Sequence, residues 1–545
     1  MTESISLIVL ILPLISSDAR VGDWPQWGGR DDRNMVSAER NLPASFIAGK
    51  KSADGRGIDM ATTQNVRWAV KLGSQTYSNP TVAGGRVFIG TNDYGLKDPR
   101  FEPTGGGLLK CLDAATGTLL WQLVVPRLVV DKENWNLDQY ELGICSSPTV
   151  DGDRVYLVTN RCEVICLDVH GMADGNDGPY VDEGQYMVGP GKKAVVPGPQ
   201  DADILWCYDI VRELFVWPHD AAGCSVLVHG DLVYANTSNG VDRTLRNVPA
   251  PRAPSLIALD KHTGRLAAKD GEQIGLRLFH GQWSSPSLGV VNGKPLILFG
   301  GGDGVCYAFE ALDKPPEWTT VLKKAWSFDC NPPEYRFKDG QPIDYYAGDA
   351  RFSKVNTGDG TYLGPSEIIA TPVLYNNRVY VATGQDPLHG RARGILNCID
   401  ATQTGDITAT GKVWSYQQID RSLSTVAIAD GLLYIGDVAG TLHCLDLATG
   451  RPYWIHPSGS ESWASPFVVD GKVYFGTEKG LFTLAAGRQS YLVGQTRLGS
   501  ACWCTPIAAN GVLYVASERY LWAVQSPPTS PQANATGSYR ARPVR

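Results

Sequence analysis

The chain has 545 residues, of which 43% are hydrophobic and 19% are charged, and its formal net charge is -7. This composition is typical of a globular protein, and the mild acidity argues against nucleic acid as a partner, because nucleic-acid-binding surfaces are normally basic. The 60 Gly, 34 Pro, 15 Trp and 23 Tyr residues favour an all-β protein with many turns and much aromatic packing.

The N-terminus is predicted to carry a signal peptide over residues 1–19. Residues 5–15 form an apolar run as long as a signal-peptide core and too short to span a bilayer comfortably, and Ser17 and Ala19 offer a small-residue cleavage site. The usual positive charge before the run is missing, so a disordered N-terminus stays an alternative. We expect an exported protein, periplasmic or extracellular, with an N-terminal extension over residues 20–60 and no membrane span.

A tandem repeat organises residues 61–525. Val426, Pro466 and Pro506 are spaced by forty residues, and a tyrosine follows each of them after eight residues. Self-similarity at a period of ~40 residues, with short strands and Gly turns inside each unit, is typical of propeller blades. Further anchors at the same position of the repeat are Pro80, Pro148, Val226, Pro286 and Pro372. Eight anchors predict an all-β, eight-bladed β-propeller of four-stranded antiparallel blades.

The third strand of several units ends in a recurring turn of the form Asp-x-x-Thr-Gly, as at Asp113, Asp260 and Asp446. Asp bonds the backbone two residues on and Gly accepts positive φ, so this pattern predicts a tight hairpin. The Trp that follows, as at Trp121 and Trp454, is expected to lie on the outer strand and to pack on the next blade. Four cysteines share one position before the turn, which favours buried packing over disulfides; they are Cys111, Cys166, Cys398 and Cys444.

The two ends of the repeat array are expected to interlock. The last unit stops at residues 520–524 without a fourth strand, and a spare strand precedes the first anchor. A ring leaves two exposed sheet edges unless its ends pair. We therefore predict that residues 65–72 supply the outermost strand of the last blade, and that residues 526–545, which lack apolar residues, form a disordered tail.

Long polar insertions interrupt the units and are too large for hairpin turns, which is typical of functional covers or mobile segments. They span residues 124–142, 171–203, 240–254, 312–324 and 330–367.

The turn motifs at residues 110–121 and 441–454, with the strand pattern Ser-Pro-x-Val-x-x-Gly-x-Val-Tyr, resemble the PQQ-like repeat of the quinoprotein alcohol dehydrogenase superfamily. The resemblance covers residues 65–524. It implies an eight-bladed propeller, in a superfamily that includes both PQQ-dependent dehydrogenases and non-enzymatic relatives such as the propeller of outer-membrane protein assembly.

The superfamily's redox chemistry needs a Trp and often an adjacent cysteine pair around PQQ, a Ca²⁺, an Asp base and an electron acceptor. This sequence has no adjacent cysteine pair and no Cys-x-x-Cys-His, hence no covalent haem. We favour a non-catalytic, monomeric module of the cell envelope that binds a protein partner or a small polar ligand. The alternative is a PQQ- and Ca²⁺-dependent dehydrogenase of alcohols or sugars that passes electrons to a separate acceptor; a glycan-binding or glycan-cleaving propeller is a third option.

Residues just before each innermost strand are expected at one mouth of the central channel, where propellers usually bind ligands. If His219 and Asp220 lie on a strand, their side chains point in opposite directions, which argues against a pair. The alternative for all the candidates named next is that the tryptophans pack between blades and the charged side chains are solvated. The candidate ligand-binding residues are Tyr77, Glu141, His219, Asp220, His280, Gln282, Trp283, Arg421, Glu461, Trp463 and Trp503.

The run Asp-Gly-Asn-Asp-Gly at residues 174–178 echoes a calcium loop but lacks the terminal Glu at the required spacing. Asp174, Asn176 and Asp177 are therefore weak metal candidates, and a solvated turn is the alternative.

Overall fold

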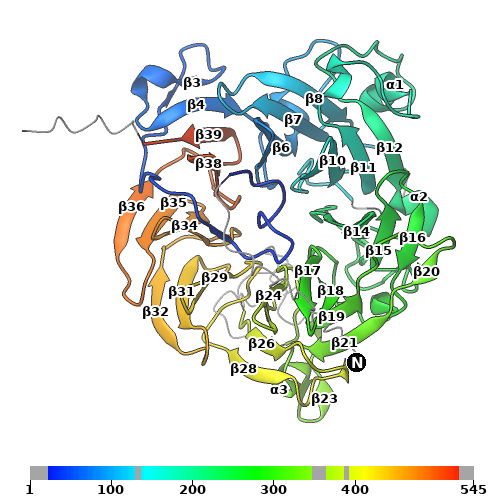
Figure 1. The fold of residues 1–545 in the computed structure, drawn as a ribbon, viewed down its shortest axis with the longest axis vertical. Coiled ribbons are helices and arrows are strands. Elements are labelled where there is room, and N and C mark those ends of the chain that lie inside the picture. The colour runs from blue at the N-terminus through cyan, green and yellow to red at the C-terminus, as the bar shows by residue number, and fades with distance from the viewer. Residues whose placement is uncertain (1–21, 129–134, 136, 346–363, 386–391, 527–545) are drawn as a thin grey trace, which may run out of the picture.

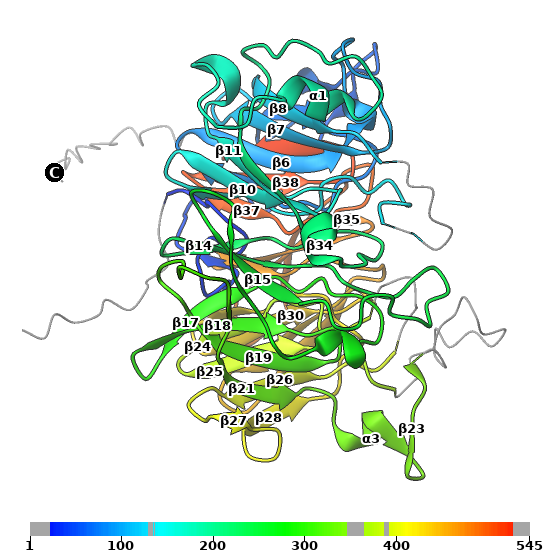
Figure 2. The same cartoon turned by 90° about the vertical axis from the view of Figure 1, so that its right-hand side faces the viewer.

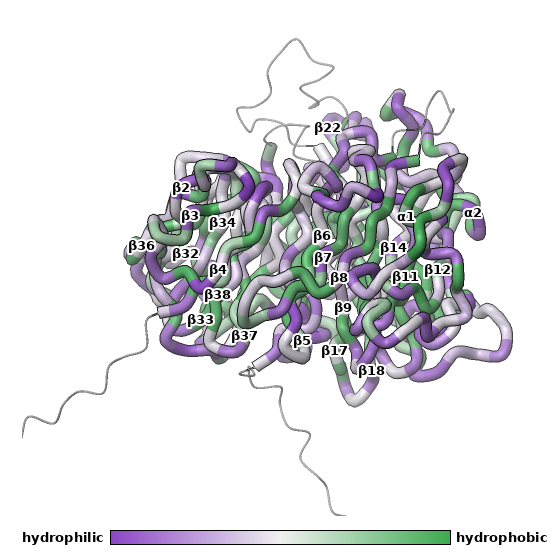
Figure 3. The backbone as a smooth tube through the Cα atoms, turned by 90° about the horizontal axis from the view of Figure 1, so that it is seen from above, coloured by the Kyte–Doolittle hydropathy of each residue, from purple (hydrophilic) through white to green (hydrophobic). Residues whose placement is uncertain are grey.

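A computed structural model describes residues 22–128, 135, 137–345, 364–385 and 392–526. Eight sheets stand side by side around a central axis, which confirms the predicted eight-bladed propeller (Figure 1). In the view from above, apolar residues follow the strands and hydrophilic residues gather in the connecting loops (Figure 3). The predicted signal peptide, and all of the predicted tail except Ser526, lie outside the described residues.

Blades 1 to 4 follow one another in the chain, each as a meander from the channel outwards. Blade 1 consists of β5 (Thr81–Ala83), β6 (Arg86–Asn92), β7 (Gly107–Asp113) and β8 (Leu119–Val125), and blade 2 of β9 (Thr149–Asp151), β10 (Arg154–Val158), β11 (Glu163–Asp168) and β12 (Ile204–Asp209). Blade 3 consists of β13 (Leu227–His229), β14 (Leu232–Asn236), β15 (Leu256–Asp260) and β16 (Leu266–Lys269), and blade 4 of β17 (Ser287–Val291), β18 (Lys294–Gly300), β19 (Val305–Glu310) and β21 (Lys324–Asp329).

Blades 5 to 8 complete the ring. Blade 5 consists of β24 (Val373–Tyr375), β25 (Arg378–Ala382), β26 (Leu396–Asp400) and β28 (Lys412–Tyr416), and blade 6 of β29 (Ala427–Ala429), β30 (Leu432–Gly436), β31 (Thr441–Asp446) and β32 (Pro452–Pro457). Blade 7 consists of β33 (Phe467–Val469), β34 (Lys472–Thr477), β35 (Gly480–Ala485) and β36 (Leu492–Thr496), and blade 8 of β37 (Ile507–Ala509), β38 (Val512–Ala516), β39 (Tyr520–Val524) and β4 (Val66–Lys71).

Several short strands, helices and turns are added to the eight four-stranded blades. Parallel two-residue strands extend three sheets: β20 (Thr320–Val321) joins blade 3, β27 (Gly405–Asp406) joins blade 4 and β1 (Val36–Ser37) joins blade 7. The remaining elements are the pairs β2 (Lys50–Lys51) with β3 (Ile58–Asp59) and β22 (Phe337–Lys338) with β23 (Gln341–Pro342), the helices α1 (Glu183–Val188), α2 (Ile210–Leu214) and α3 (Pro333–Arg336), and the turns η1 (Met60–Thr62), η2 (Asp93–Gly95), η3 (Gly171–Ala173) and η4 (Ile274–Leu276). Within the described parts of the chain, no helix has the length and apolar character that a membrane span requires.

The Asp-x-x-Thr-Gly turns link neighbouring blades as predicted. Asp113 accepts a hydrogen bond from the Thr116 amide at 2.8 Å, and Gly117 has φ 73°. A Cβ at Gly117 would lie 2.7 Å from the indole of Trp68 on blade 8, so only glycine lets that ring rest on the turn. Trp121 in turn donates from Nε1 to the Val169 carbonyl that follows β11 at 3.0 Å. The same indole-to-carbonyl bond joins Trp454 of blade 6 to blade 7 at 2.9 Å.

The predicted closure of the ring is confirmed. β4 pairs antiparallel with β39 and places Ala69 opposite Trp522. The Leu72 amide extends the ladder by donating to the Arg519 carbonyl at 2.8 Å. The edge that the last blade would otherwise expose is therefore covered by a strand from the start of the array.

Residues 22–39 lie inside the ring, and we refer to them as the channel plug (Figure 1). The plug forms hydrogen bonds with all eight blades, through backbone groups and through side chains of Trp27, Arg33 and Asn34. Its partners, in order from blade 1 to blade 8, are Val82, Val150, Val226, Leu288, Thr371, Ile428, Val468 and Asn510. A single segment thus ties the inner strands of the whole ring together.

Arg33 is the centre of the channel plug, and its side chain is fully buried. The guanidinium donates to the carbonyls of Val226 at 2.9 Å and Pro286 at 3.2 Å, which belong to blades 3 and 4, and to the Gln26 side chain at 2.9 Å and the Trp27 carbonyl. Burial lowers the pKa of Arg33 to about 10, so it stays charged at neutral pH. Four acceptors balance the cost of burying this charge.

Candidate functional site

Each blade presents two residues to the channel just before its innermost strand, one and three positions before the anchor. The residues one position before the anchor form a girdle, because a backbone amide on one blade donates to the side-chain oxygen of the equivalent residue on the next blade. Seven such bonds of 2.5–3.3 Å join the described residues of the girdle. The girdle consists of Asn79, Ser147, Ser225, Ser285, Thr371, Thr425, Ser465 and Thr505.

A cavity of about 420 Å³ lies at the channel mouth. Trp27 of the channel plug lines it and donates from Nε1 to Thr371 of the girdle at 3.1 Å, which closes the channel below the cavity. Above the girdle, residues three positions before the anchors contribute the wall: Tyr77, Cys145, Gly223, Trp283, Ile369, Leu423 and Trp463. The cavity is therefore a blind pocket of the size that suits a small organic ligand.

Three aromatic rings form a stack on one side of the cavity. Tyr77 stacks on Trp463, with ring centroids 5.6 Å apart and an interplanar angle of 18°. Trp463 stacks in turn on Trp503, at 4.6 Å and 23°. Trp503 is held by a hydrogen bond of 3.0 Å from Nε1 to Glu518. Such an arrangement presents a flat, ordered aromatic surface to a ligand.

Charged groups are sparse in the cavity. Among the described lining residues, Asp220 supplies the one charged side chain and Cys145 the one thiol. The low-dielectric surroundings of Cys145 raise its pKa to about 12, so the thiol is protonated at neutral pH. The lining thus offers stacking surfaces and hydrogen-bonding edges rather than an activated thiolate.

Four of the candidate residues line the cavity: Tyr77, Asp220, Trp283 and Trp463. Trp503 lies behind Trp463 in the aromatic stack. Cys145 and Trp27 also line the cavity and were missed by the sequence analysis. Cys145 stands three residues before Pro148, as Tyr77 stands before Pro80, so the repeat position could have identified it.

The remaining candidates lie elsewhere. Glu141 accepts a hydrogen bond from Tyr94 at 2.6 Å and lies 3.3 Å from Arg127, outside the cavity lining. Gln282 is buried and donates to Ser255 at 2.7 Å, Arg421 is fully buried, and Glu461 is exposed.

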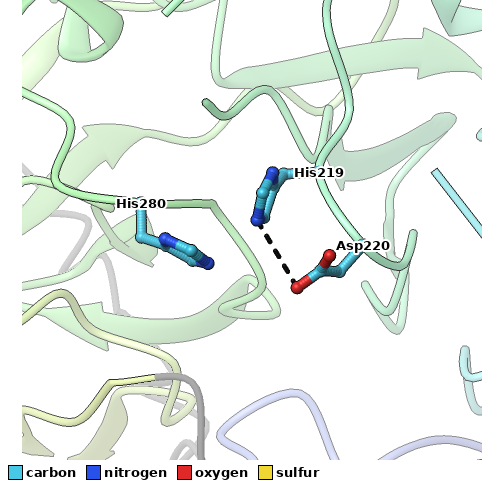
Figure 4. A group of neighbouring side chains, drawn as sticks. All are labelled: His219, Asp220 and His280. Carbon is cyan, nitrogen blue, oxygen red and sulfur yellow. Dashed lines mark ion pairs between the residues drawn. The ribbon is translucent and has the colours of Figure 1, made fainter. Parts of the chain in front are cut away.

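His219 and Asp220 do not lie on a strand, so the condition under which they would point in opposite directions is not met. Asp220 has φ 53°, in the left-handed region, and the chain is not extended there. His219 Nε2 consequently lies 3.4 Å from Asp220 Oδ2 (Figure 4). His280, from the loop before blade 4, packs edge-on against His219 with ring centroids 4.2 Å apart.

The residues of the calcium-like run contact three different partners. Asp174 lies 3.6 Å from His170, Asn176 donates to Glu183 at 3.1 Å, and the Asp177 amide donates to Asp203 at 2.9 Å.

The cysteines behave as predicted for buried packing residues. Cys111, Cys166, Cys398 and Cys444 lie on the third strands of their blades and are buried. All twelve cysteines fall within the described residues and are free thiols.

The comparison with protein families identifies the repeat. The family model described as outer membrane protein assembly factor BamB (PQQ_2) matches residues 100–270, 172–456 and 255–526. The chain belongs to this family. The resemblance to PQQ-like repeats is therefore confirmed, and no curated protein matches the sequence.

Several solved structures are similar to this BamB-family propeller at low sequence identity. A europium-containing methanol dehydrogenase has a TM-score of 0.52 and 12% identity, over 91% of this chain and 89% of that one. BamB from Moraxella catarrhalis has a TM-score of 0.47 and 13% identity, over 85% of this chain and 98% of that one. Quinohemoprotein alcohol dehydrogenase from Comamonas testosteroni has a TM-score of 0.45 and 14% identity, over 94% of this chain and 82% of that one.

The cavity of this BamB-family propeller does not fit a PQQ and Ca²⁺ pair. Ca²⁺ takes six to eight oxygen ligands with several carboxylates among them. The described lining offers the carboxylate of Asp220 alone, and that carboxylate faces an imidazole nitrogen. The donor set is thus poorly matched to a hard cation.

Proposed function

We propose that this protein is a non-catalytic binding module of the cell envelope, and that its ligand is a small planar molecule held in the blind cavity at the channel mouth. The observation that carries the proposal is the stack of Tyr77, Trp463 and Trp503 above a channel closed by Trp27. Membership of the outer membrane protein assembly factor family and the apolar run at residues 5–15 support the envelope location.

The physical basis is surface complementarity. A flat ring that lies against the aromatic wall formed by Tyr77 and Trp463 removes apolar surface of the wall and of the ring itself from water. Girdle oxygens and Asp220 then offer polar partners to the edge of the ring. The walls belong to strand-linked positions on blades 1 to 7, so the site is largely preformed and little binding energy is lost in ordering it.

We expect Trp463→Ala to weaken the binding of planar probes by ~10-fold or more, because stacking of a flat ring on an aromatic side chain contributes ~1–3 kcal/mol. The measurement is quenching of tryptophan fluorescence, checked by calorimetry, with a naphthalene sulfonate, a naphthoquinone and a free flavin. Trp318→Ala is the matched control, since this indole is 78% exposed, and it should leave binding unchanged.

Equal binding by both variants would place the ligand elsewhere and overturn the cavity assignment. Reduction of a dye with alcohols or sugars, seen only after PQQ and Ca²⁺ are added, would instead support the dehydrogenase alternative and contradict a non-catalytic role.

A protein partner is the second candidate, supported by the description of the family as an outer membrane protein assembly factor. The hairpin of β22 and β23 projects from the ring beside α3 (Figure 2) and exposes 53% of Phe337. Its base is fixed, because Arg336 bonds Asp329 at 2.6 Å and the Asp303 carbonyl at 2.9 Å. A fixed, exposed aromatic is typical of a protein-contact residue.

Phe337→Ser should therefore abolish recovery of the partner that cross-links to the wild-type protein in envelope fractions, and should weaken binding of that purified partner by ~10-fold or more. Tyr491→Ser, which changes a 67% exposed ring beside blade 7, is the control and should retain the partner. Loss in both variants, or in neither, would rule out the hairpin as the contact.

A further inference from the structure

A compact group of two imidazoles and one carboxylate lies beside the cavity. His219, Asp220 and His280 each offer a ligand atom, and these atoms lie within 4.8 Å of one another. Figure 4 shows the two rings and the carboxylate facing a common space. Both histidines are fully buried and Asp220 is 7% exposed, so the group is enclosed by protein on most sides.

The backbone holds the group in place from three loops. The His219 amide donates to the Ser238 carbonyl at 3.2 Å, and the Val241 amide donates to the His280 carbonyl at 2.9 Å. Gly240 sits between them, and a Cβ there would come within 2.6 Å of His219 Cβ and 2.9 Å of the His280 carbonyl oxygen. Only a glycine permits this close approach, so the loops before blades 3 and 4 are locked together.

The orientation of His219 is fixed by its second nitrogen. Nδ1 lies 2.7 Å from the Val241 carbonyl oxygen, which can only accept, so Nδ1 carries the proton. The lone pair of the neutral ring is then on Nε2, the nitrogen 3.4 Å from Asp220 Oδ2. A histidine that donates one N–H to a backbone carbonyl is the usual arrangement of a metal ligand.

We propose that His219, Asp220 and His280 bind a divalent transition-metal ion of the zinc class. Zinc bonds of about 2.0–2.2 Å to nitrogen and oxygen place neighbouring tetrahedral ligands about 3.4 Å apart, which matches the Nε2 to Oδ2 distance. Imidazole nitrogens favour zinc over the hard cations Ca²⁺ and Mg²⁺. This inference goes beyond the proposed function, since planar-ligand binding needs no metal.

The site would keep one coordination position for an exogenous ligand. Asp220 and Trp283 both line the cavity, and the Trp283 ring lies 5.6 Å from His280 and 6.1 Å from His219. A ligand in the cavity therefore meets the metal site along its wall. Three protein ligands with an open fourth position suit a molecule that carries a carboxylate or another oxygen donor.

A second group, Asp168, His170 and Asp174, has similar ligand types and serves as the internal control. His170 and Asp174 are exposed, with side chains 46% and 51% accessible. Exposed groups of this kind bind metal weakly without an enclosing scaffold.

The test is titration of chelator-treated full-length protein with Zn²⁺ and with Co²⁺ as a spectroscopic probe. We expect one equivalent to bind in the presence of excess Ca²⁺. His219→Ala and His280→Ala should weaken zinc binding by ~100-fold, and Asp220→Asn by ~10-fold, since each removes a ligand. His170→Ala and Trp463→Ala should stay within about 2-fold of the wild type, which separates this inference from the stacking site.

Melting curves identify any variant that fails to fold. If the histidine variants fail to fold, the zinc affinity of Asp220→Asn tests the proposal, because this substitution keeps the shape of the side chain at the cavity wall. A change in the visible Co²⁺ spectrum of Asp220→Asn supports direct coordination. Absence of zinc binding to the wild type, an unchanged affinity in Asp220→Asn, or loss of binding in His170→Ala would overturn the proposal.

Discussion

Deletion of residues 65–72 is expected to lower the melting temperature by at least ~10 °C or to cause aggregation. The deletion removes β4, exposes the edge of β39, and breaks the bond from Trp68 Nε1 to the Ala114 carbonyl of blade 1 at 3.1 Å. In a repeat array the free energy of unfolding depends on interfaces between neighbours, so the loss of closure affects two blades at once. Differential scanning calorimetry and size-exclusion chromatography provide the measurement.

Deletion of residues 53–56 is the matched control. These residues form the exposed tip between β2 and β3, and their removal should leave the melt within a few degrees of the wild type. An unchanged melt after deletion of residues 65–72 would mean that the ring does not depend on its closing strand.

Arg33→Ala is expected to cost about 3–5 kcal/mol of unfolding free energy. The change removes four hydrogen bonds, takes the guanidinium donor from the Pro286 carbonyl, and leaves the Val226 carbonyl with the Thr149 hydroxyl in place of two donors. Arg33→Lys keeps the charge but not the forked geometry, so it should fall between the alanine variant and the wild type. Chemical denaturation followed by tryptophan fluorescence measures the difference.

Arg56→Ala is a control for loss of positive charge, because this side chain is 79% exposed, and it should change stability by less than ~1 kcal/mol. If Arg33→Ala is equally mild, the channel plug does not hold the inner strands together.

The ring could be predicted from sequence because its determinants recur. Each anchor directly precedes an innermost strand. In every blade except blade 4, the aromatic residue eight positions later is buried in the second strand, as Tyr434 and Tyr514 show. The closing strand followed from counting strands at the two ends. These signals are local, repeated and dependent on burial, which is what a period in the sequence records.

The channel plug gave no such signal. Residues 22–39 are polar, contain two adjacent glycines and have no periodicity. Their partners are mostly backbone groups, so nothing in the partner side chains indicates the contact. From the sequence alone, Arg33 would be predicted to be a solvated surface charge, whereas the structure surrounds its guanidinium with carbonyls of two blades.

The site was predictable in part for the same reason. Tyr77, Trp283 and Trp463 occupy one repeat position that faces the channel, so the sequence could place them at the mouth. The pairing of His219 with Asp220 depends on one left-handed residue, and the approach of His280 depends on a loop contact at Gly240. Neither feature has a periodic pattern.

The channel plug also sets the order in which the molecule can be completed. Glu39 accepts a hydrogen bond from the amide of Asn510, which lies 471 residues further along the chain, so this contact can form only after blade 8 has been synthesised. Blades that are synthesised first can form their own meanders during synthesis, but the channel plug cannot complete its contacts until the last blade is present. Until then the inner strands lack their common partner, and the interior of the ring stays open to solvent.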